Sequence, residues 1–200
     1  MTSTARIVRR TEFLETPWRN RGGVTFEIAR EPAAGEAFEW RLSLARIEAP
    51  GPFSDFSGYE RALTLVSGAG CRLRGVSAEP IELRDVGATA LFDGGAAVSC
   101  ELLSGRCFDL NLMVRKPGRI LAVDQFALLS HETEALPSDA HGAVFCLEGA
   151  IECLHLPSGR RLTLGLHDVF IAPAAESGEW RLMRGAAERA SVITHAWLEA

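Results

Sequence analysis

Three short segments in the first 115 residues predict strands with one apolar face and one polar face. They are VTFEIA (24–29), EWRLSLA (39–45) and FDLNLMV (108–114). Because successive side chains of a strand point to opposite faces, the polar residues of each segment lie together. These residues are Thr25, Glu27, Arg41, Ser43, Asp109, Asn111 and Met113. A half-exposed sheet gives the same pattern, but in a barrel one face of each strand lines the lumen, where polar groups form a binding pocket.

A turn whose side chains could either cap it or bind a ligand precedes the first of these segments. Trp18, Arg19 and Asn20 are followed closely by Gly22 and Gly23. Two glycines directly before a strand predict a tight turn or a bulge. No G-K-[ST] sequence follows them, so they do not form a phosphate-binding loop. We expect this turn to form the lip of a barrel.

Guanidinium and amide groups near these strands suit an anionic ligand. Arg19, Arg41 and Arg61 can each bind a carboxylate through paired N–H groups. Asn20 and Asn111 each offer a donor and an acceptor. With Trp18 and Phe53 as aromatic walls, the predicted ligand-binding residues are Trp18, Arg19, Asn20, Thr25, Glu27, Arg41, Ser43, Phe53, Arg61, Asn111 and Met113.

Composition excludes several classes of function. The chain has 200 residues, 47% of them hydrophobic and 24% charged, as in a globular protein with a sizeable core. A net charge of −5 without a basic block argues against nucleic acid and anionic membranes as partners. The five cysteines form no C-x-x-C pair and sit among apolar residues, which predicts buried reduced thiols. With no signal-peptide pattern and no membrane-spanning apolar run, we expect a cytoplasmic protein.

The second half of the chain repeats the first at an offset of 81 residues. LTLVSG (63–68) falls on VFCLEG (144–149), and IEL (81–83) falls on LTL (162–164). Each half resembles the cupin sequence pattern, in which a strand ends in Gly and is followed by its hairpin partner. A turn with Gly or Asp then precedes a Pro, as in HDVFIAP (167–173). The sequence therefore predicts an all-β bicupin of two fused cupin-like (RmlC-like jelly-roll) β-barrels.

The predicted domains are an N-terminal barrel over 1–115 and a C-terminal barrel over 116–200. Residues 1–60 would supply the early strands of the first barrel, and 115–140 would be a connection that can exchange strands between barrels. The offset sets Ala190, Val192 and Thr194 against Asp109, Asn111 and Met113, while Trp180 and Trp197 are large enough to fill the second lumen. We therefore expect the pocket in the first barrel.

The histidines argue against a metal centre. Cupins often hold a metal through two or three His and a Glu, but none of the five His lies in the first 130 residues. The remaining alternative is a site made of His141, His155 and Glu148. There is also no G-x-S-x-G sequence and no Cys placed beside a His, so no nucleophile is indicated. We expect no metal and no cofactor.

Several motifs resemble the HutD/Ves family. They are P-W-R-N-x-G-G-x-T-x-E-I (17–28), F-x-W-R-x-S-x-A (38–45), G-P-F-S-x-F-x-G-x-x-R-x-L-x-L (51–65) and D-L-N-x-M (109–113). The resemblance implies a bicupin linked to bacterial histidine utilization as an accessory or regulatory factor, with no established metal or reaction. The chain departs from the family at Arg21, commonly Gly, and at Phe26, commonly Arg. The second departure removes a pocket charge unless Arg21 replaces it.

We expect a small-molecule-binding protein rather than an enzyme, acting in histidine utilization on a small anionic metabolite such as urocanate or formiminoglutamate. The alternative is a metal-free cupin enzyme, an isomerase or hydrolase of a similar metabolite, with Glu27 as acid or base. A third hypothesis is a protein–protein module that forms a homodimer through its exposed sheet faces.

Overall fold

The computed structural model describes residues 4–128, 133–136, 139–174, 179–186 and 189–199. Apart from a single turn of 3-10 helix at Arg10–Glu12, the regular structure in these ranges consists of antiparallel strands. The all-β prediction is confirmed. All five cysteines are buried free thiols, as their apolar neighbours predicted.

The chain forms two compact units, which we call the N-terminal barrel and the C-terminal barrel. The N-terminal barrel comprises Phe13–Ile120 with Glu199–Ala200, and the C-terminal barrel comprises Leu121–Leu198 with Met1–Glu12. These bounds differ from the predicted division mainly at the start of the chain, because β1 (Arg6–Val8) pairs with β17 (Val169–Ala172) of the C-terminal barrel. A three-residue strand carries no local pattern that reveals so distant a partner.

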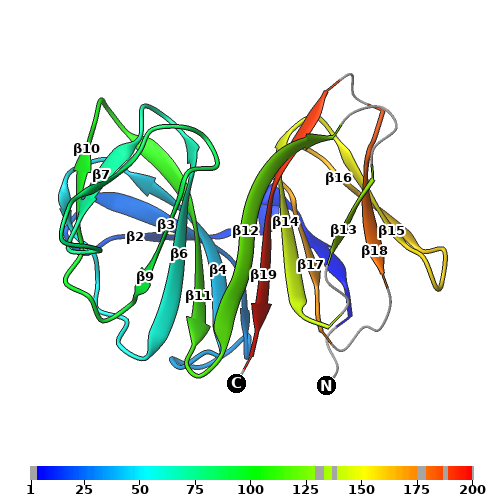
Figure 1. Cartoon of the computed structure of the whole chain (residues 1–200), viewed down its shortest axis with the longest axis horizontal. Coiled ribbons are helices and arrows are strands. Elements are labelled where there is room, and N and C mark those ends of the chain that lie inside the picture. Colours follow the sequence, from blue (N-terminus) through cyan, green and yellow to red (C-terminus); the bar gives the residue numbers. More distant parts are fainter. Residues whose placement is uncertain (1–3, 129–132, 137–138, 175–178, 187–188, 200) are drawn as a thin grey trace. The chain divides into compact units, whose positions relative to one another are not determined.

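Two facing sheets build the N-terminal barrel. Its strands are β2 (Leu14–Pro17), β3 (Gly23–Glu31), β4 (Trp40–Ile47), β5 (Gly51–Pro52), β6 (Tyr59–Ser67), β7 (Cys71–Arg74), β8 (Ile81–Leu83), β9 (Thr89–Asp93), β10 (Ser99–Leu102) and β11 (Cys107–Arg115). One sheet has the order β2-β3-β4-β11-β6-β9 and the other β5-β10-β7-β8 (Figure 1). Leu63, Leu65, Leu73 and Phe92 belong to the core between them. This core occupies one part of the lumen and leaves the faces of β3, β4 and β11 for the polar residues.

The C-terminal barrel has the same construction. Its remaining strands are β12 (Arg119–Leu128), β13 (Thr133–Leu136), β14 (His141–Glu148), β15 (Ile151–His155), β16 (Arg161–Leu164), β18 (Trp180–Arg184) and β19 (Ala190–Leu198). The sheet orders are β1-β17-β14-β19-β12 and β13-β18-β15-β16 (Figure 1). Val144, Phe170, Leu182 and Val192 pack in the core of this barrel.

Equivalent strands of the two barrels occur in the same order, which confirms the predicted repeat. The run β11-β6-β9 corresponds to β19-β14-β17, and β10-β7-β8 corresponds to β18-β15-β16. The predicted offset is wrong in the last strand, however. Leu63 lies opposite Asn111, whereas Val144 lies opposite Thr194 and not Val192, so the offset there is 83 residues. The equivalents of Asp109, Asn111 and Met113 are therefore Val192, Thr194 and Ala196. A slip of two residues keeps every side chain on its face, so the contrast between the barrels stands.

Asp168 fastens the first residues of the chain to the C-terminal barrel. Its Oδ2 accepts a hydrogen bond from Arg9 Nη1 at 2.7 Å, and its Oδ1 accepts one from the backbone N–H of Arg10 at 2.9 Å. The backbone N–H of Gly165 donates to Oδ2 at 2.9 Å. Burial opposes ionisation of this carboxyl, but the hydrogen bonds from Arg10, Arg9 and Gly165 outweigh it and lower the pKa of Asp168.

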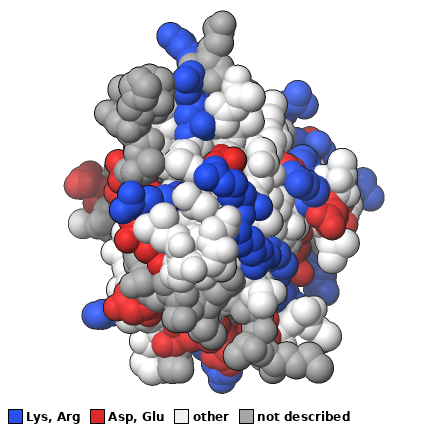
Figure 2. Space-filling view, turned by 90° about the vertical axis from the view of Figure 1, so that its right-hand side faces the viewer, with Lys and Arg blue, Asp and Glu red and all other residues white. Residues whose placement is uncertain are grey.

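Charges of both signs are interspersed on the face shown in Figure 2. In the C-terminal barrel, Arg181 Nε lies 2.7 Å from Glu179 Oε1, and Arg161 pairs with Glu152. Such exposed pairs keep a surface hydrated and contribute little to stability. Within the described ranges, the structure has no helix that is long and apolar enough to cross a membrane.

Candidate ligand-binding site

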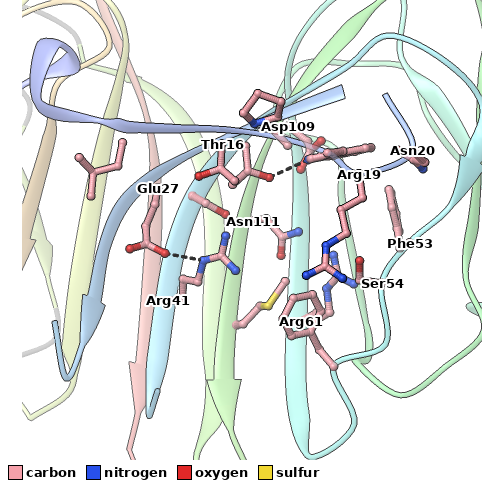
Figure 3. Close-up of a pocket in the computed structure, with 18 of the residues that line it drawn as sticks. Thr16, Arg19, Asn20, Glu27, Arg41, Phe53, Ser54, Arg61, Asp109 and Asn111 are labelled. Carbon is pink, nitrogen blue, oxygen red and sulfur yellow. Dashed lines mark hydrogen bonds and ion pairs between the residues drawn. The ribbon is translucent and has the colours of Figure 1, made fainter. Parts of the chain in front are cut away.

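A cavity of about 490 Å³ lies in the N-terminal barrel, and every residue predicted to bind a ligand lines it (Figure 3). Its size falls in the range of small-metabolite pockets, roughly 300–1,000 Å³. The predicted residues on strands are Thr25 and Glu27 of β3, Arg41 and Ser43 of β4, Arg61 of β6, and Asn111 and Met113 of β11. The lip and wall supply Trp18, Arg19, Asn20 and Phe53. That these residues share one cavity is shown, whereas their role in binding stays a prediction.

Strand register places the polar residues in rows across the sheet. Because β3, β4, β11 and β6 are neighbours, residues at matching positions lie side by side. The three rows are Thr25–Ala45–Asp109, Glu27–Ser43–Asn111 and Arg41–Met113–Arg61. The middle row offers hydroxyl and amide groups, and the third has a guanidinium at each end. The lumen face is thus an ordered array of charged and neutral polar groups.

Arg61 is a buried cation surrounded by aromatic rings. Its side chain is 3% exposed, and its guanidinium carbon lies 4.9 Å from the ring centroid of Phe92, 5.3 Å from that of Phe53 and 5.5 Å from that of Phe56. It forms no ion pair with any described carboxylate. Burial lowers the pKa of Arg61 to about 10, against the opposing charge of Asp109, so the side chain remains a cation at neutral pH. The rings stabilise the cation but leave its N–H groups available to an anion.

Arg41, by contrast, is compensated within the protein. Its Nε lies 3.0 Å from Glu27 Oε2, and Arg30 Nε lies 3.9 Å from Glu27 Oε1. Burial lowers the pKa of Arg41, and the neighbouring Glu27 opposes that shift. Glu27 therefore lies between two cations. Arg61, in contrast, has no ion pair with a described carboxylate. Its Nε has no hydrogen-bond partner in the described chain, and Asp109 acts on it through its charge.

The turn at residues 17–23 forms the lip of the cavity. Trp18 Nε1 donates a hydrogen bond to Thr25 Oγ1 at 2.8 Å, and the Trp18 ring meets the Phe53 ring edge-on at 6.5 Å between centroids. Asn20 Oδ1 accepts a hydrogen bond from the backbone N–H of Gly22 at 2.9 Å. Trp18 and Asn20 therefore both shape the turn and line the cavity. In Figure 3, Arg19 extends from the lip toward Arg61.

Both departures from the family pattern have a structural explanation. Arg21 has a φ of 59°, a left-handed conformation that Gly adopts at least cost, which explains a Gly at this position. Its side chain is exposed and does not belong to the lining of the cavity. Phe26 lies on the opposite face of β3 from Thr25 and Glu27 and is buried there. The idea that Arg21 replaces a pocket charge lost at Phe26 is thus wrong.

The predicted binding set does not include several lining residues. They are Leu14, Thr16, Pro17, Ala45, Pro52, Ser54, Phe56 and Asp109. Strand alternation already places Asp109 on the polar face with Asn111 and Met113, although it is not among the predicted ligand-binding residues. It is 1% exposed, and burial raises its pKa to about 7 although the charge of Arg61 opposes the rise. Phe56 lies in a loop between β5 and β6, where no periodicity indicates its direction.

The C-terminal barrel also contains a cavity, of about 400 Å³. The prediction that Trp180 and Trp197 fill this lumen is half right. Trp180 packs in the core, but Trp197 alternates out of phase with Ala190 and Val192 of that core, so it faces away from it. The lining residues of the cavity are Ala122, Asp124, Gln125, Phe126, Glu134, Ala135, Leu136, Leu182, Thr194, His195 and Ala196. No arginine is among these described residues, so the described lining of this cavity has no counterpart of Arg61.

The histidines do not assemble a metal site in the part of the chain that the structure describes. No group of three or more His, Cys, Asp or Glu residues there is arranged to hold a metal ion. His155 Nδ1 lies 2.8 Å from Ser158 Oγ, and its ring stacks on Trp180. His141 stacks on Trp197. The alternative site of His141, His155 and Glu148 is therefore not formed, and His131 lies outside the described residues.

Comparison with protein families decides the classification. The HutD family model matches residues 10–190. The chain belongs to the HutD family. This family is associated with the histidine utilization locus, and a Pseudomonas putida relative is named as an uncharacterized 21.2 kDa protein of the hutC 3′ region. That relative is 41% identical over 114 residues, which are 56% of this chain and 58% of the relative.

Other HutD-like proteins extend the comparison. Protein Ves of Citrobacter koseri is 40% identical over 100 residues, which are 50% of this chain and 52% of Ves. The matched region thus spans little more than half the length of these two relatives. A conserved protein of unknown function from Pseudomonas aeruginosa PAO1 has a TM-score of 0.86 at 30% identity, over 98% of this chain and 99% of that one. HutD from Pseudomonas fluorescens SBW25 has a TM-score of 0.76 at 27% identity, over 98% and 100%.

A more distant neighbour confirms the fold class. Oxalate decarboxylase from Bacillus subtilis has a TM-score of 0.73 at 8% identity, over 100% of this chain and 78% of that one. At that identity the likeness concerns the fold alone. Together with the two repeated jelly-roll units, it confirms the predicted bicupin.

Proposed function

We propose that this HutD-family protein is a cytoplasmic binding protein that acts as an accessory or regulatory factor in bacterial histidine utilization. Its ligand is a small anionic metabolite such as urocanate or formiminoglutamate, bound in the cavity of the N-terminal barrel. The family's association with the histidine utilization locus supports the pathway. The chemistry of the cavity supports the class of ligand.

The observation that carries the proposal is the buried cation of Arg61, which has no ion pair with a described carboxylate and no hydrogen-bond partner for its Nε. Removing a charge from water is costly unless another group replaces its hydration. Arg61 is buried among three phenylalanine rings and has no ion pair with the described residues. A bound carboxylate would supply the missing partner through two parallel N–H···O bonds. The cavity is therefore best suited to a ligand with an acid group.

The other lining groups suit a ligand that also has a planar polar part. Asn111 is 6% exposed, and its Oδ1 accepts no hydrogen bond from the described protein. Trp18 and Phe53 present aromatic surface near the lip. Urocanate has an acid group for Arg61, a flat ring for these aromatic walls and a ring N–H for Asn111. Formiminoglutamate has two acid groups, either of which can pair with Arg61, and an imino N–H for Asn111.

Isothermal titration calorimetry tests the proposal with Arg61→Met as the main variant. The titrations use urocanate and formiminoglutamate at about pH 6, where Asp109 is mostly protonated. A lost charge-assisted pair costs about 1.5–3 kcal/mol, so the affinity of the variant falls roughly 10-fold to 150-fold. Arg181→Met is the matched control, because Arg181 is an arginine of the C-terminal barrel outside both cavities. It binds like the wild type.

Two results would contradict the proposal. If neither metabolite binds the wild-type protein, the proposed ligand class is wrong. If Arg61→Met binds as tightly as the wild type, the anion does not contact Arg61. Melting temperatures of all three proteins show whether a loss of binding is only a loss of folding.

One observation favours a metal-free enzyme as the second candidate. Asp109 can hold or release a proton near neutral pH, because burial raises its pKa to about 7. Glu27, the acid or base suggested by the sequence, instead forms an ion pair with Arg41, with 3.0 Å between Glu27 Oε2 and Arg41 Nε. Proton NMR of each metabolite mixed with wild type, Asp109→Asn or Glu27→Gln shows which of the two carboxyls a reaction needs. We expect turnover, if present in the wild type, to vanish in Asp109→Asn, and equal turnover by all three proteins would exclude both carboxyls.

A further inference from the structure

Asp109 lines the cavity and has no hydrogen-bond partner in the described chain. It lies on the lumen face of β11, two residues before Asn111, and its side chain is 1% exposed. Neither carboxylate oxygen has a hydrogen-bond partner within the described ranges. A carboxylate in this position loses its hydration and gains little in return, so burial favours the protonated form and raises the pKa of Asp109 to about 7. The structure thus keeps a titratable proton inside the ligand cavity.

Among the charged groups around Asp109, Arg61 is the cation that favours its ionised form. From β6, the charge of Arg61 acts on Asp109 and opposes the rise of its pKa. From β4, Arg41 lines the same cavity, but its charge is paired with Glu27 of β3 at 3.0 Å. Arg61 is also the group proposed above to bind the ligand's acid. The ligand and Asp109 therefore compete for the same positive charge.

Two thiols behind Asp109 do not supply charge. Cys71 of β7 and Cys107 of β11 both lie close enough to Asp109 for its charge to act on them. A hydrogen bond with Cys100 and burial raise the pKa of Cys71 to about 12. A hydrogen bond with Cys71 and burial raise the pKa of Cys107 as well. Both thiols stay neutral over the range in which Asp109 titrates.

We infer that Asp109 takes up one proton when an anionic ligand binds at Arg61, so that the cavity binds the anion and a proton together. The inference rests on the proposed function, because it requires an acid group at Arg61. Once that group shares the guanidinium, an ionised Asp109 would be a second buried anion beside the first. Like charges at short range disfavour joint ionisation, and protonation of Asp109 removes the conflict. The cavity thus holds the anionic ligand in the state in which Asp109 is protonated.

Proton uptake makes the affinity depend on pH in a defined way. Below about pH 6 Asp109 already carries its proton, so the affinity no longer changes through this group. Above about pH 7 each binding event must collect a proton, and the affinity falls roughly tenfold per pH unit. At about pH 8 the uptake approaches one proton per ligand, and at about pH 6 it approaches zero. A more acidic solution therefore strengthens binding.

Calorimetry in buffers of different ionisation enthalpy measures this uptake directly. Urocanate is titrated into the wild type in Hepes and in Tris at about pH 8, and in Mes and in Bis-Tris at about pH 6. The change of apparent enthalpy with buffer enthalpy gives the proton count at each pH. Asp109→Asn is measured in the same way, so that protons taken up by the ligand itself cancel in the difference. Asp85→Asn, which removes an exposed carboxyl outside the cavity, is the matched control. We expect the wild type and Asp85→Asn to take up roughly one proton more than Asp109→Asn at about pH 8, and an equal number at about pH 6.

Each outcome points to one part of the account. Wild-type binding at about pH 8 without proton uptake would overturn the inference and leave the proposed function in place. Uptake of the same size in Asp109→Asn would also overturn it, since another group would then take the proton. A wild-type count of zero at about pH 8 needs no variant, so the inference can be overturned even if Asp109→Asn fails to fold. Absence of binding at every pH would refute the proposed function itself.

Discussion

Replacing Asp109 by Asn changes how the stability of the protein depends on pH. The carboxyl has a pKa of about 7 in the folded protein, compared with about 3.9 in an unfolded chain. The folded state therefore binds more protons than the unfolded state between these values, and stability falls as the pH rises through that window. Three pKa units correspond to about 4 kcal/mol as an upper bound, and local relaxation reduces the penalty to about 2–4 kcal/mol near pH 8.

Asp109→Asn removes this penalty without changing the shape of the side chain. The new amide leaves its donors without partners, which costs about 1–3 kcal/mol at every pH. The absolute stability of the variant can thus move either way, but its pH dependence cannot. Urea unfolding of both proteins at about pH 5 and pH 8 isolates the effect. About two of the three pKa units fall between these pH values, so we expect the difference in the free energy of unfolding to shift in favour of the variant by about 1–3 kcal/mol at the higher pH. An equal difference at both pH values would refute the assignment of a buried, titrating Asp109.

Three further predictions concern the two barrels. Asn111→Ala weakens binding of urocanate by roughly tenfold with little change in melting temperature. Val192→Ala, in the core of the C-terminal barrel, costs on the order of 1 kcal/mol or more of stability and leaves binding intact. Calorimetry measures the binding and thermal unfolding measures the stability. Gly23→Ala lowers the melting temperature and weakens ligand binding, because its Cβ would lie 2.4 Å from a backbone oxygen and 3.1 Å from the Trp18 ring; unchanged unfolding would contradict the close approach. Asp168→Asn lowers the free energy of unfolding by about 1–3 kcal/mol near neutral pH. Because the pKa of Asp168 is lowered in the fold, this loss of stability disappears as the pH falls below about 4. A loss of stability that persists in acid would exclude the ionised carboxyl as its source.

Strand alternation was sufficient to predict most of the cavity. Thr25 and Glu27 fall on one face of β3, and Arg41 and Ser43 fall on one face of β4, because a slip of one residue would bury the charges and expose the apolar residues. The structure brings all of them into one cavity. Asp109 has the same phase as Asn111, so the sequence contained the signal for it as well.

Features that depend on distant pairing could not be predicted in this way. The pairing of β1 with β17 depends on a contact between the two ends of the chain, and three residues are too few to specify it. The two extra residues before β19 shift the repeat without changing which faces are buried, so the hydrophobic pattern does not reveal them. Phe56 reaches Arg61 from a loop, where neighbouring residues give no direction.

A crystal of the wild-type protein soaked in urocanate tests the central claim most directly. The account predicts difference density in the cavity of the N-terminal barrel, with the carboxylate of urocanate paired to the guanidinium of Arg61 and its ring between the lip residue Trp18 and Asn111. Density in the cavity of the C-terminal barrel, or a ligand in the first barrel with its carboxylate turned away from Arg61, would contradict it.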